Sequence, residues 1–82
     1  MGEHTYGQKS VGLSFEPCIN PQLARGKELF AEIIDLCVAH KSLTSSHEAA
    51  RLFSIAITEA QGAHMWMEKA IMWSDIQLRK HV

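Results

Sequence analysis

Apolar residues in the C-terminal half of this chain recur at helical spacing but occupy nearly every side of the predicted helix. The stretch RLFSIAITEAQGAHMWMEKAIMW, residues 51–73, contains no proline and one glycine, which favours a helix. A helix in a small soluble domain usually keeps one face polar. The pattern therefore predicts a helix with more apolar surface than one neighbouring helix can cover.

An amphipathic helix is also predicted upstream. Asn20 followed by Pro21 is a helix start, with asparagine as the N-cap and proline at the first helical position. A seven-residue repeat of apolar positions predicts that this helix runs from Pro21 to about His40. The repeat consists of Leu23, Phe30 and Cys37. Gly26 lies in the helix interior and is expected to permit a close approach of another segment's backbone.

The residues KSLTSS, 41–46, separate the two predicted helices. Ser45 and Glu48 predict a capping box, in which serine caps the second helix and glutamate reaches back. This helix is expected to continue to about Arg79, giving a length of roughly 50 Å against roughly 30 Å for the first. A short connection predicts an antiparallel hairpin in which the second helix overhangs the first.

Three strips of apolar residues follow the longer helix. The small-residue seam consists of Ala49, Ala56, Ala60, Ala63 and Ala70. The bulky strip consists of Leu52, Ile55, Trp66, Trp73 and Ile76. A third strip consists of Phe53, Ile57, Ile71 and Leu78. One hairpin partner covers only part of this surface, and a large uncovered apolar surface marks an interaction site. We therefore expect an obligate homo-oligomer, at least a dimer with a four-helix core. The predicted interface residues are Trp66, Trp73, Ala56, Ala60 and Ala63.

The first 20 residues carry weaker signals. Residues 1–10 are polar, SVGLSF at Ser10–Phe15 predicts a short extended segment, and Pro17 and Pro21 punctuate a loop. The sequence thus divides into an N-terminal extended and loop segment, residues 1–20, and a helical hairpin domain, residues 21–82. The predicted fold class is all-α, with the hairpin assembling into an oligomeric helix bundle.

Composition narrows the classes of partner. The 82 residues include eight Lys and Arg against nine Asp and Glu, with no basic run. Proteins that bind polymeric DNA or RNA normally carry a basic patch, so such a partner is not expected. A small anionic ligand remains compatible, since two or three basic groups suffice for it. The two cysteines, the polar start MGEHTYGQKS and the lack of a long apolar run favour a cytosolic protein that does not span a membrane.

Catalytic and metal-binding motifs are not apparent. The sequence contains no GxSxG, no glycine-rich phosphate loop and no Cys/His pair at metal spacing. The five histidines are predicted to lie on the surface or at helix ends. We therefore predict a protein that is not an enzyme and needs no cofactor or metal.

One polar stripe on the second helix has two interpretations. Arg51 and Thr58 lie seven residues apart, with Ser54 between them, so all three fall on one side. The arginine fork and the hydroxyls have the chemistry to hold a phosphate. Alternatively, Arg51 pairs with a neighbouring acid and the hydroxyls bond back to helix carbonyls. Spacing alone favours the second interpretation.

The motif SIAITEAQGAHMW in the second helix and GKELFAEIID in the first resemble a family of small bacteriophage proteins. These proteins are helical-hairpin sponges that counter the CBASS and Thoeris immune systems of bacteria. The resemblance covers roughly residues 11–76. It implies a protein in the cytoplasm of the infected host that binds cyclic oligonucleotides or cyclic ADP-ribose isomers without cleaving them. It also implies dimers that combine into hexamers, with ligand pockets between protomers.

The resemblance also implies roles for individual residues. Lys27 and Arg51 match basic residues that approach ligand phosphate, and Ser54 and Thr58 fall in the matching hydroxyl-bearing segment. An aromatic residue upstream of the first helix stacks on a base in the family. Its match here is Phe15, with Tyr6 as the alternative, and the spacing departs from the family pattern. Gly26, where an aliphatic residue is common, is a second departure.

Two other functions remain open. An oligomeric helical module that binds another protein, or has a structural role, would need no small-molecule ligand. A DNA-binding protein is disfavoured by the charge balance.

Overall fold

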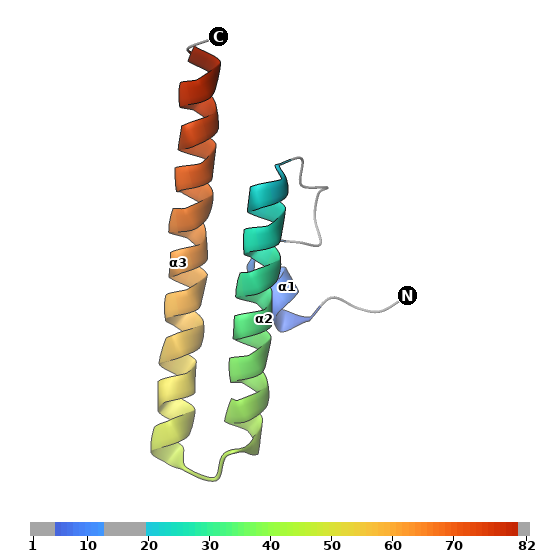
Figure 1. Cartoon of the computed structure of the whole chain (residues 1–82). Helices are drawn as coiled ribbons and strands as arrows, with labels where there is room; N and C mark the ends of the chain where they lie inside the picture. The colour runs from blue at the N-terminus through green and yellow to red at the C-terminus, as the bar shows by residue number, and fades with distance from the viewer. Residues whose placement is uncertain (1–4, 13–19, 81–82) are drawn as a thin grey trace.

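The protein is an antiparallel helical hairpin with a short additional helix packed against it (Figure 1). The computed structural model describes residues 5–12 and 20–80, with side-chain detail as far as residue 74. Its helices are α1 (Tyr6–Ser10), α2 (Pro21–Leu43) and α3 (His47–Lys80). At 1.5 Å per residue, the 34 residues of α3 extend roughly 51 Å and the 23 residues of α2 roughly 35 Å. The predicted overhang of the second helix is therefore confirmed.

The start of α2 is capped as the sequence predicts. Asn20 Oδ1 accepts hydrogen bonds from the backbone nitrogens of Gln22 at 2.8 Å and Leu23 at 3.0 Å, and Pro21 occupies the first helical position. These bonds satisfy amide groups that have no partner within the helix. The helix ends at Leu43, three residues beyond the predicted end.

The cap of α3 differs from the prediction by one residue. Ser46, rather than Ser45, is the capping residue: its Oγ accepts from the backbone nitrogen of Ala49 at 3.1 Å. The backbone nitrogen of Ser46 donates to Thr44 Oγ1 at 3.1 Å, so a threonine satisfies the amide of the capping residue and Glu48 is not needed for it. Glu48 is thereby left to form a different contact, with Arg51.

The predicted extended segment at the N-terminus is wrong for the residues that the structure describes. Residues Tyr6–Ser10 form α1, and a capping box lies at its start. Thr5 Oγ1 accepts a hydrogen bond from the backbone nitrogen of Gln8 at 3.0 Å, and Gln8 Oε1 accepts one from the backbone nitrogen of Thr5 at 2.9 Å. After α1 the chain turns at Gly12, whose φ of 78° suits glycine. Residues 13–15 of the predicted strand lie outside the described residues.

The buried core joins α1 to both long helices. It consists of Val11, Ala31, Ile34 and Ile57. Gly7 secures α1 to α2, because its backbone nitrogen donates to Asp35 Oδ1 at 2.8 Å and its Cα faces the α2 backbone.

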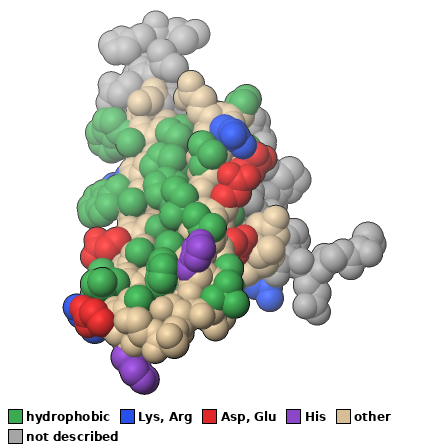
Figure 2. Space-filling model, turned by 60° about the horizontal axis from the view of Figure 1, so that its bottom comes forward, with side chains coloured by type: hydrophobic (Ala, Val, Ile, Leu, Met, Phe, Trp, Pro, Cys, Tyr) green, Lys and Arg blue, Asp and Glu red, His purple; other side chains and the backbone are tan. Residues whose placement is uncertain are grey.

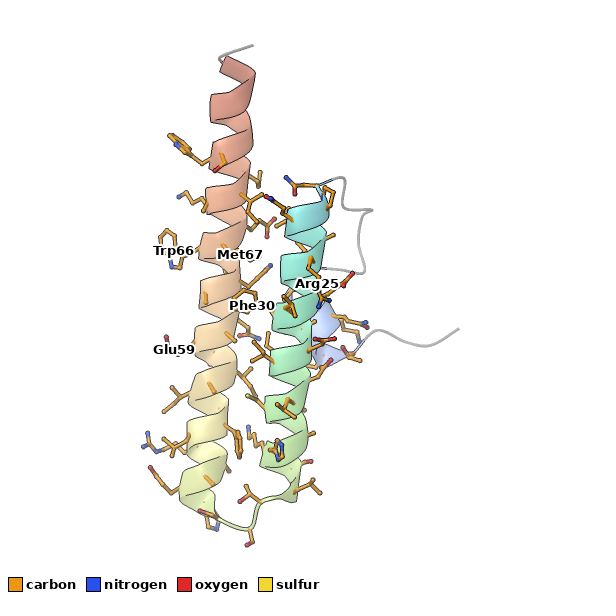
Figure 3. All side chains as sticks on the ribbon, viewed as in Figure 1. Arg25, Phe30, Glu59, Trp66 and Met67 are labelled. Atoms are coloured by element: carbon orange, nitrogen blue, oxygen red, sulfur yellow. The ribbon has the colours of Figure 1, made fainter. Side chains whose placement is uncertain are left out.

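The two long helices pack against each other. Phe30 of α2 and Met67 of α3 point toward the interface between these helices (Figure 3). A Cβ on Gly26 would lie 2.6 Å from the Met67 sulfur, so this glycine makes room for a side chain of α3 rather than for the predicted close approach of its backbone.

Gly7→Ala is expected to release α1 from α2 while leaving the hairpin folded. An added Cβ at Gly7 would collide with the carbonyl oxygen of Ala31, a backbone atom that cannot move aside easily. Undocking exposes Val11, whose burial contributes about 1.5–3 kcal/mol. Amide hydrogen exchange should show lost protection at α1 and Val11. The matched control is Gly62→Ala, where nothing lies within 4 Å and the helix should gain about 1 kcal/mol. Unchanged protection of α1 in the Gly7 variant would contradict this account of its docking.

In the part of the chain that the structure describes, no helix has the combined length and apolar character needed to cross a membrane.

Candidate functional site

The bulky strip of α3 is uncovered in the single chain, as the sequence predicted. Leu52, Ile55, Trp66 and Trp73 keep 51%, 43%, 71% and 62% of their surface exposed. Trp66 points away from α2, on the same side of α3 as Glu59 (Figure 3). Exposed tryptophans in a row are costly for an isolated domain, because each holds a large apolar surface in water. The side chain of Ile76, the last member of the strip, lies outside the described residues.

Apolar side chains are exposed on α2 as well. Its exposed large apolar residues are Leu29, Ile33, Leu36, Val38 and Leu43. Figure 2 shows hydrophobic side chains gathered in a long band over one face of the molecule. Uncovered apolar surface is thus present on both long helices.

The small-residue seam does not form one surface. Ala56 and Ala63 are exposed beside the bulky strip. Ala60 instead packs against the core of its own hairpin. The third strip, through Phe53 and Ile57, faces α2 and supplies the intrachain contact. Leu78 of that strip lies outside the described side chains.

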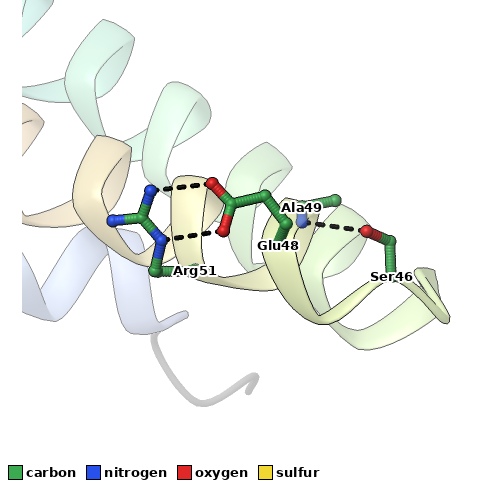
Figure 4. Close-up of polar contacts among 4 residues, drawn as sticks. All are labelled: Ser46, Glu48, Ala49 and Arg51. Carbon is green, nitrogen blue, oxygen red and sulfur yellow. Dashed lines mark hydrogen bonds and ion pairs between the residues drawn. The ribbon is translucent and has the colours of Figure 1, made fainter.

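Arg51 forms an ion pair on the surface of α3. Its Nε donates to Glu48 Oε1 at 3.0 Å and its Nη2 donates to Glu48 Oε2 at 2.7 Å (Figure 4). The hydrogen bonds from the guanidinium lower the pKa of the Glu48 carboxyl, and the same bonds raise the pKa of Arg51. Nη1 of Arg51 contacts no carboxylate in residues 5–12 and 20–74. Two of the three guanidinium nitrogens therefore bond to Glu48, and Nη1 is left for a ligand.

The two hydroxyls of the polar stripe bond back to their own helix. Ser54 Oγ donates to the carbonyl oxygen of Ala50 at 3.1 Å, and Thr58 Oγ1 donates to that of Ser54 at 3.2 Å. Their hydrogen atoms are used, so what the hydroxyls offer to a ligand is oxygen lone pairs. In this state they are placed to accept hydrogen bonds rather than to donate them to a phosphate.

Two hollows meet at these hydroxyls. The Arg51 hollow, of about 340 Å³, is lined by Arg51, Ser54, Ile55, Thr58 and Glu59. The three-helix hollow, of about 430 Å³, is lined by Tyr6, Val38, Lys41, Ser54, Ile57, Thr58 and Gln61. Ser54 and Thr58 line both. The structure therefore brings together Arg51, Ser54 and Thr58, as the sequence predicted.

The structure does not bring Lys27 to this place. Gly26, its neighbour in α2, contacts Met67, which follows Arg51 by 16 residues in α3. Sixteen helical residues correspond to roughly 24 Å, so Lys27 and Arg51 of one chain lie far apart along the hairpin. Phe15, the predicted stacking aromatic, lies outside the described residues.

Sequence reasoning did not identify Lys41 and Gln61, and it ranked Tyr6 second. Tyr6 reaches the hollow because α1 is helical, and its hydroxyl accepts from Gln61 Nε2 at 3.1 Å. The Thr5–Gln8 capping box was the signal that could have placed it. Lys41 is brought there by the pairing of α2 with α3, which one sequence does not reveal.

One histidine differs from the prediction. His64 is buried between the long helices, with 5% of its surface exposed and its ring packed edge-on against Phe30 at 6.2 Å. Its Nε2 lies 3.3 Å from Glu68 Oε2, yet neither ring nitrogen forms a hydrogen bond within the described residues. No group of three metal-ligating side chains occurs among those residues.

Comparison with protein-family models, with curated proteins and with solved structures found no match for this chain.

Proposed function

We propose that this protein sequesters a cyclic nucleotide immune signal between protomers, without cleaving it, and so blocks an anti-phage defence of the infected bacterium. The observation that carries the proposal is the setting of the Arg51 hollow. All five of its lining residues belong to α3, so it is open to solvent in one chain. One of these lining residues, Ile55, is an exposed member of the bulky strip. A second copy that covers this strip would also close the hollow.

The separation of the two predicted basic residues means that the proposal requires a pocket between protomers. Lys27 and Arg51 lie roughly 24 Å apart along one hairpin, too far for both to touch one small ligand. They can meet on one ligand only if they come from different chains. In a symmetric assembly each basic residue is then repeated, and a chain with a formal charge of −1 builds a locally positive pocket.

Binding without chemistry fits the groups at the Arg51 hollow. Nη1 of Arg51 is available for one charge-assisted hydrogen bond to phosphate, and Ser54 and Thr58 offer lone pairs to sugar or base donors. Withdrawal of the ligand from solution requires affinity and a closed pocket and nothing more. Such a protein acts by mass action, in the cytoplasm where the signals are made.

A second candidate is an oligomeric interaction module that has no small-molecule ligand. The observation that favours it is the contact set of the polar stripe, in which Arg51 holds Glu48 and both hydroxyls bond to helix carbonyls. Every one of these contacts also occurs in a plain surface helix.

Arg51→Ala separates the two candidates. Under the sequestration proposal, the variant should bind cyclic nucleotides roughly 10- to 100-fold more weakly, because a charge-assisted hydrogen bond contributes about 1.5–3 kcal/mol. The oligomer should persist. Isothermal titration against cyclic di- and trinucleotides and cyclic ADP-ribose isomers measures the affinity.

Glu48→Gln is the matched control for this variant. It breaks the same ion pair but keeps the guanidinium. If Arg51 binds ligand, the control should retain affinity. If both variants dissolve the oligomer equally, Arg51 serves only as the partner of Glu48, and the interaction module is the better account.

A further inference from the structure

A second cavity is built within a single chain. The three-helix hollow takes Tyr6 from α1, Val38 and Lys41 from α2, and its remaining lining residues from α3. Its volume of about 430 Å³ lies within the usual range for small-molecule sites. The Arg51 hollow is lined by residues of α3 alone, whereas this one is lined by residues of three helices.

The charge in this hollow favours an anion. Lys41 lines it, and no carboxylate does. Within the described residues Lys41 forms no ion pair, unlike Arg25 and Arg51, which hold Glu28 and Glu48. An ammonium group without a counter-charge, beside an apolar wall, is a suitable site for phosphate.

The hydroxyls in the hollow favour a ligand that also donates hydrogen bonds. Ser54 and Thr58 have committed their hydrogens to helix carbonyls, so they present lone pairs. A phosphate oxygen has no hydrogen to give them, but a sugar hydroxyl has. Lys41 is thus suited to bind an anionic part of a ligand, and the two hydroxyls are suited to bind a part that carries hydroxyl groups.

A flat ring fits the remaining walls. Ile57 and Val38 are apolar, and Tyr6 also lines the hollow. Gln61 Nε2 donates to Tyr6 Oη and to Ser10 Oγ, both at 3.1 Å, and so holds α1 against α3. Gln61 is therefore a positioning residue for the aromatic ring. Stacking on such a ring contributes to nucleotide binding regardless of which base is present.

We propose that the three-helix hollow binds one ribonucleoside monophosphate unit within a single chain. Lys41 holds the phosphate, Ser54 and Thr58 accept from the sugar hydroxyls, and the base lies against Tyr6. This inference rests on the proposed function, because Ser54 and Thr58 border both hollows. It differs in needing no second copy and in using Lys41 where the pocket between protomers uses Arg51.

The test is isothermal titration with adenosine monophosphate as the probe. The full chain should bind one molecule per chain. Lys41→Gln should weaken binding about tenfold or more, since it removes a charge-assisted contact. Arg25→Gln is the matched control: it removes the same charge from α2 at an exposed site outside the hollow, and should leave the affinity unchanged. Circular dichroism verifies that both variants fold.

A second arm uses only the unaltered protein. The 2′,3′-dideoxy analogue of the probe lacks the sugar hydroxyls that Ser54 and Thr58 would accept from, and should bind roughly fivefold more weakly. Inorganic phosphate alone should bind far more weakly than the nucleotide. Equal affinity for the analogue and the parent would overturn the assignment of the hydroxyls, whatever the variants do.

Cyclic nucleotides are titrated in parallel, so that the two proposals fail separately. If they bind while the monophosphate does not, or if Lys41→Gln and Arg25→Gln behave alike toward the monophosphate, the single-chain site is overturned and the proposed function stands. If the monophosphate binds as described and no cyclic nucleotide does, the proposed function falls and the single-chain site stands. Absence of heat with every probe overturns both.

Discussion

Trp66→Ala is expected to dissociate the assembly at concentrations where the unaltered protein remains oligomeric. Trp66 keeps 71% of its surface exposed in the single chain and lies at the centre of the bulky strip. Tryptophan truncation at an interface commonly costs 2 kcal/mol or more, which is about 30-fold in the dissociation constant. Sedimentation velocity over a concentration series should show the variant at lower mass. The exposed ring, with Lys69 Nζ 5.6 Å from its centroid, makes no core contact whose loss would unfold the chain.

Leu43→Ala is the control for this experiment. Leu43 is an exposed apolar residue, at 81%, but it lies at the hairpin loop and outside the bulky strip. Its removal should leave the mass distribution unchanged. A monomeric unaltered protein, or a Trp66 variant with unchanged mass, would contradict assembly through the bulky strip.

Ile34→Ala is expected to cost about 2–5 kcal/mol of unfolding free energy, because it deletes three buried carbon atoms and leaves a cavity. Ile34 is 0% exposed, at the centre of the core that joins α1, α2 and α3. A domain of this size has a total stability of the order of 5–15 kcal/mol, so the loss is a large fraction of it. Urea unfolding followed by circular dichroism measures the change.

Ile33→Ala is the neighbouring control. It removes the same atoms from a residue that is 49% exposed. At a protein concentration low enough for single chains, it should cost less than about 1 kcal/mol. Equal losses for the two variants would mean that the core is not centred on Ile34.

The hairpin could be predicted from the sequence because its signals are local. The Asn20–Pro21 start, the seven-residue apolar repeat of α2 and the uninterrupted pattern of α3 each depend on residues close together in the chain. The excess of apolar positions on α3 could also be recognised from residues close together in the chain, and the exposure of Trp66 confirms it. The cap of α3 was misplaced by one residue because two serines adjoin there, and only the bond from Ser46 to Thr44 decides between them.

Helix α1 was missed because its stability comes from tertiary contacts. Five residues are too few for an apolar periodicity, and an isolated helix of that length is unstable in water. Docking of Gly7 on Asp35 and burial of Val11 hold it in place. The capping box at Thr5 was the only local signal, among the described residues, that marked this helix.

The candidate site was predictable in part. The spacing of Arg51, Ser54 and Thr58 placed them together on α3, and the structure agrees. The direction of the two hydroxyl hydrogens depends on the competition between ligand and helix carbonyls, which spacing does not decide. The distance between Lys27 and Arg51 follows from the antiparallel register of α2 and α3. The presence of Lys41 beside Tyr6 depends on three helices meeting.

The measurement that most directly tests sequestration is native mass spectrometry of the protein mixed with a panel of cyclic nucleotides. The account predicts an oligomer that carries bound nucleotide at a fixed number per assembly. After denaturation, the released nucleotide should have its original mass, because it is bound and not cleaved. A single-chain mass with no ligand from any member of the panel, or a released nucleotide whose ring has been opened, would contradict the account.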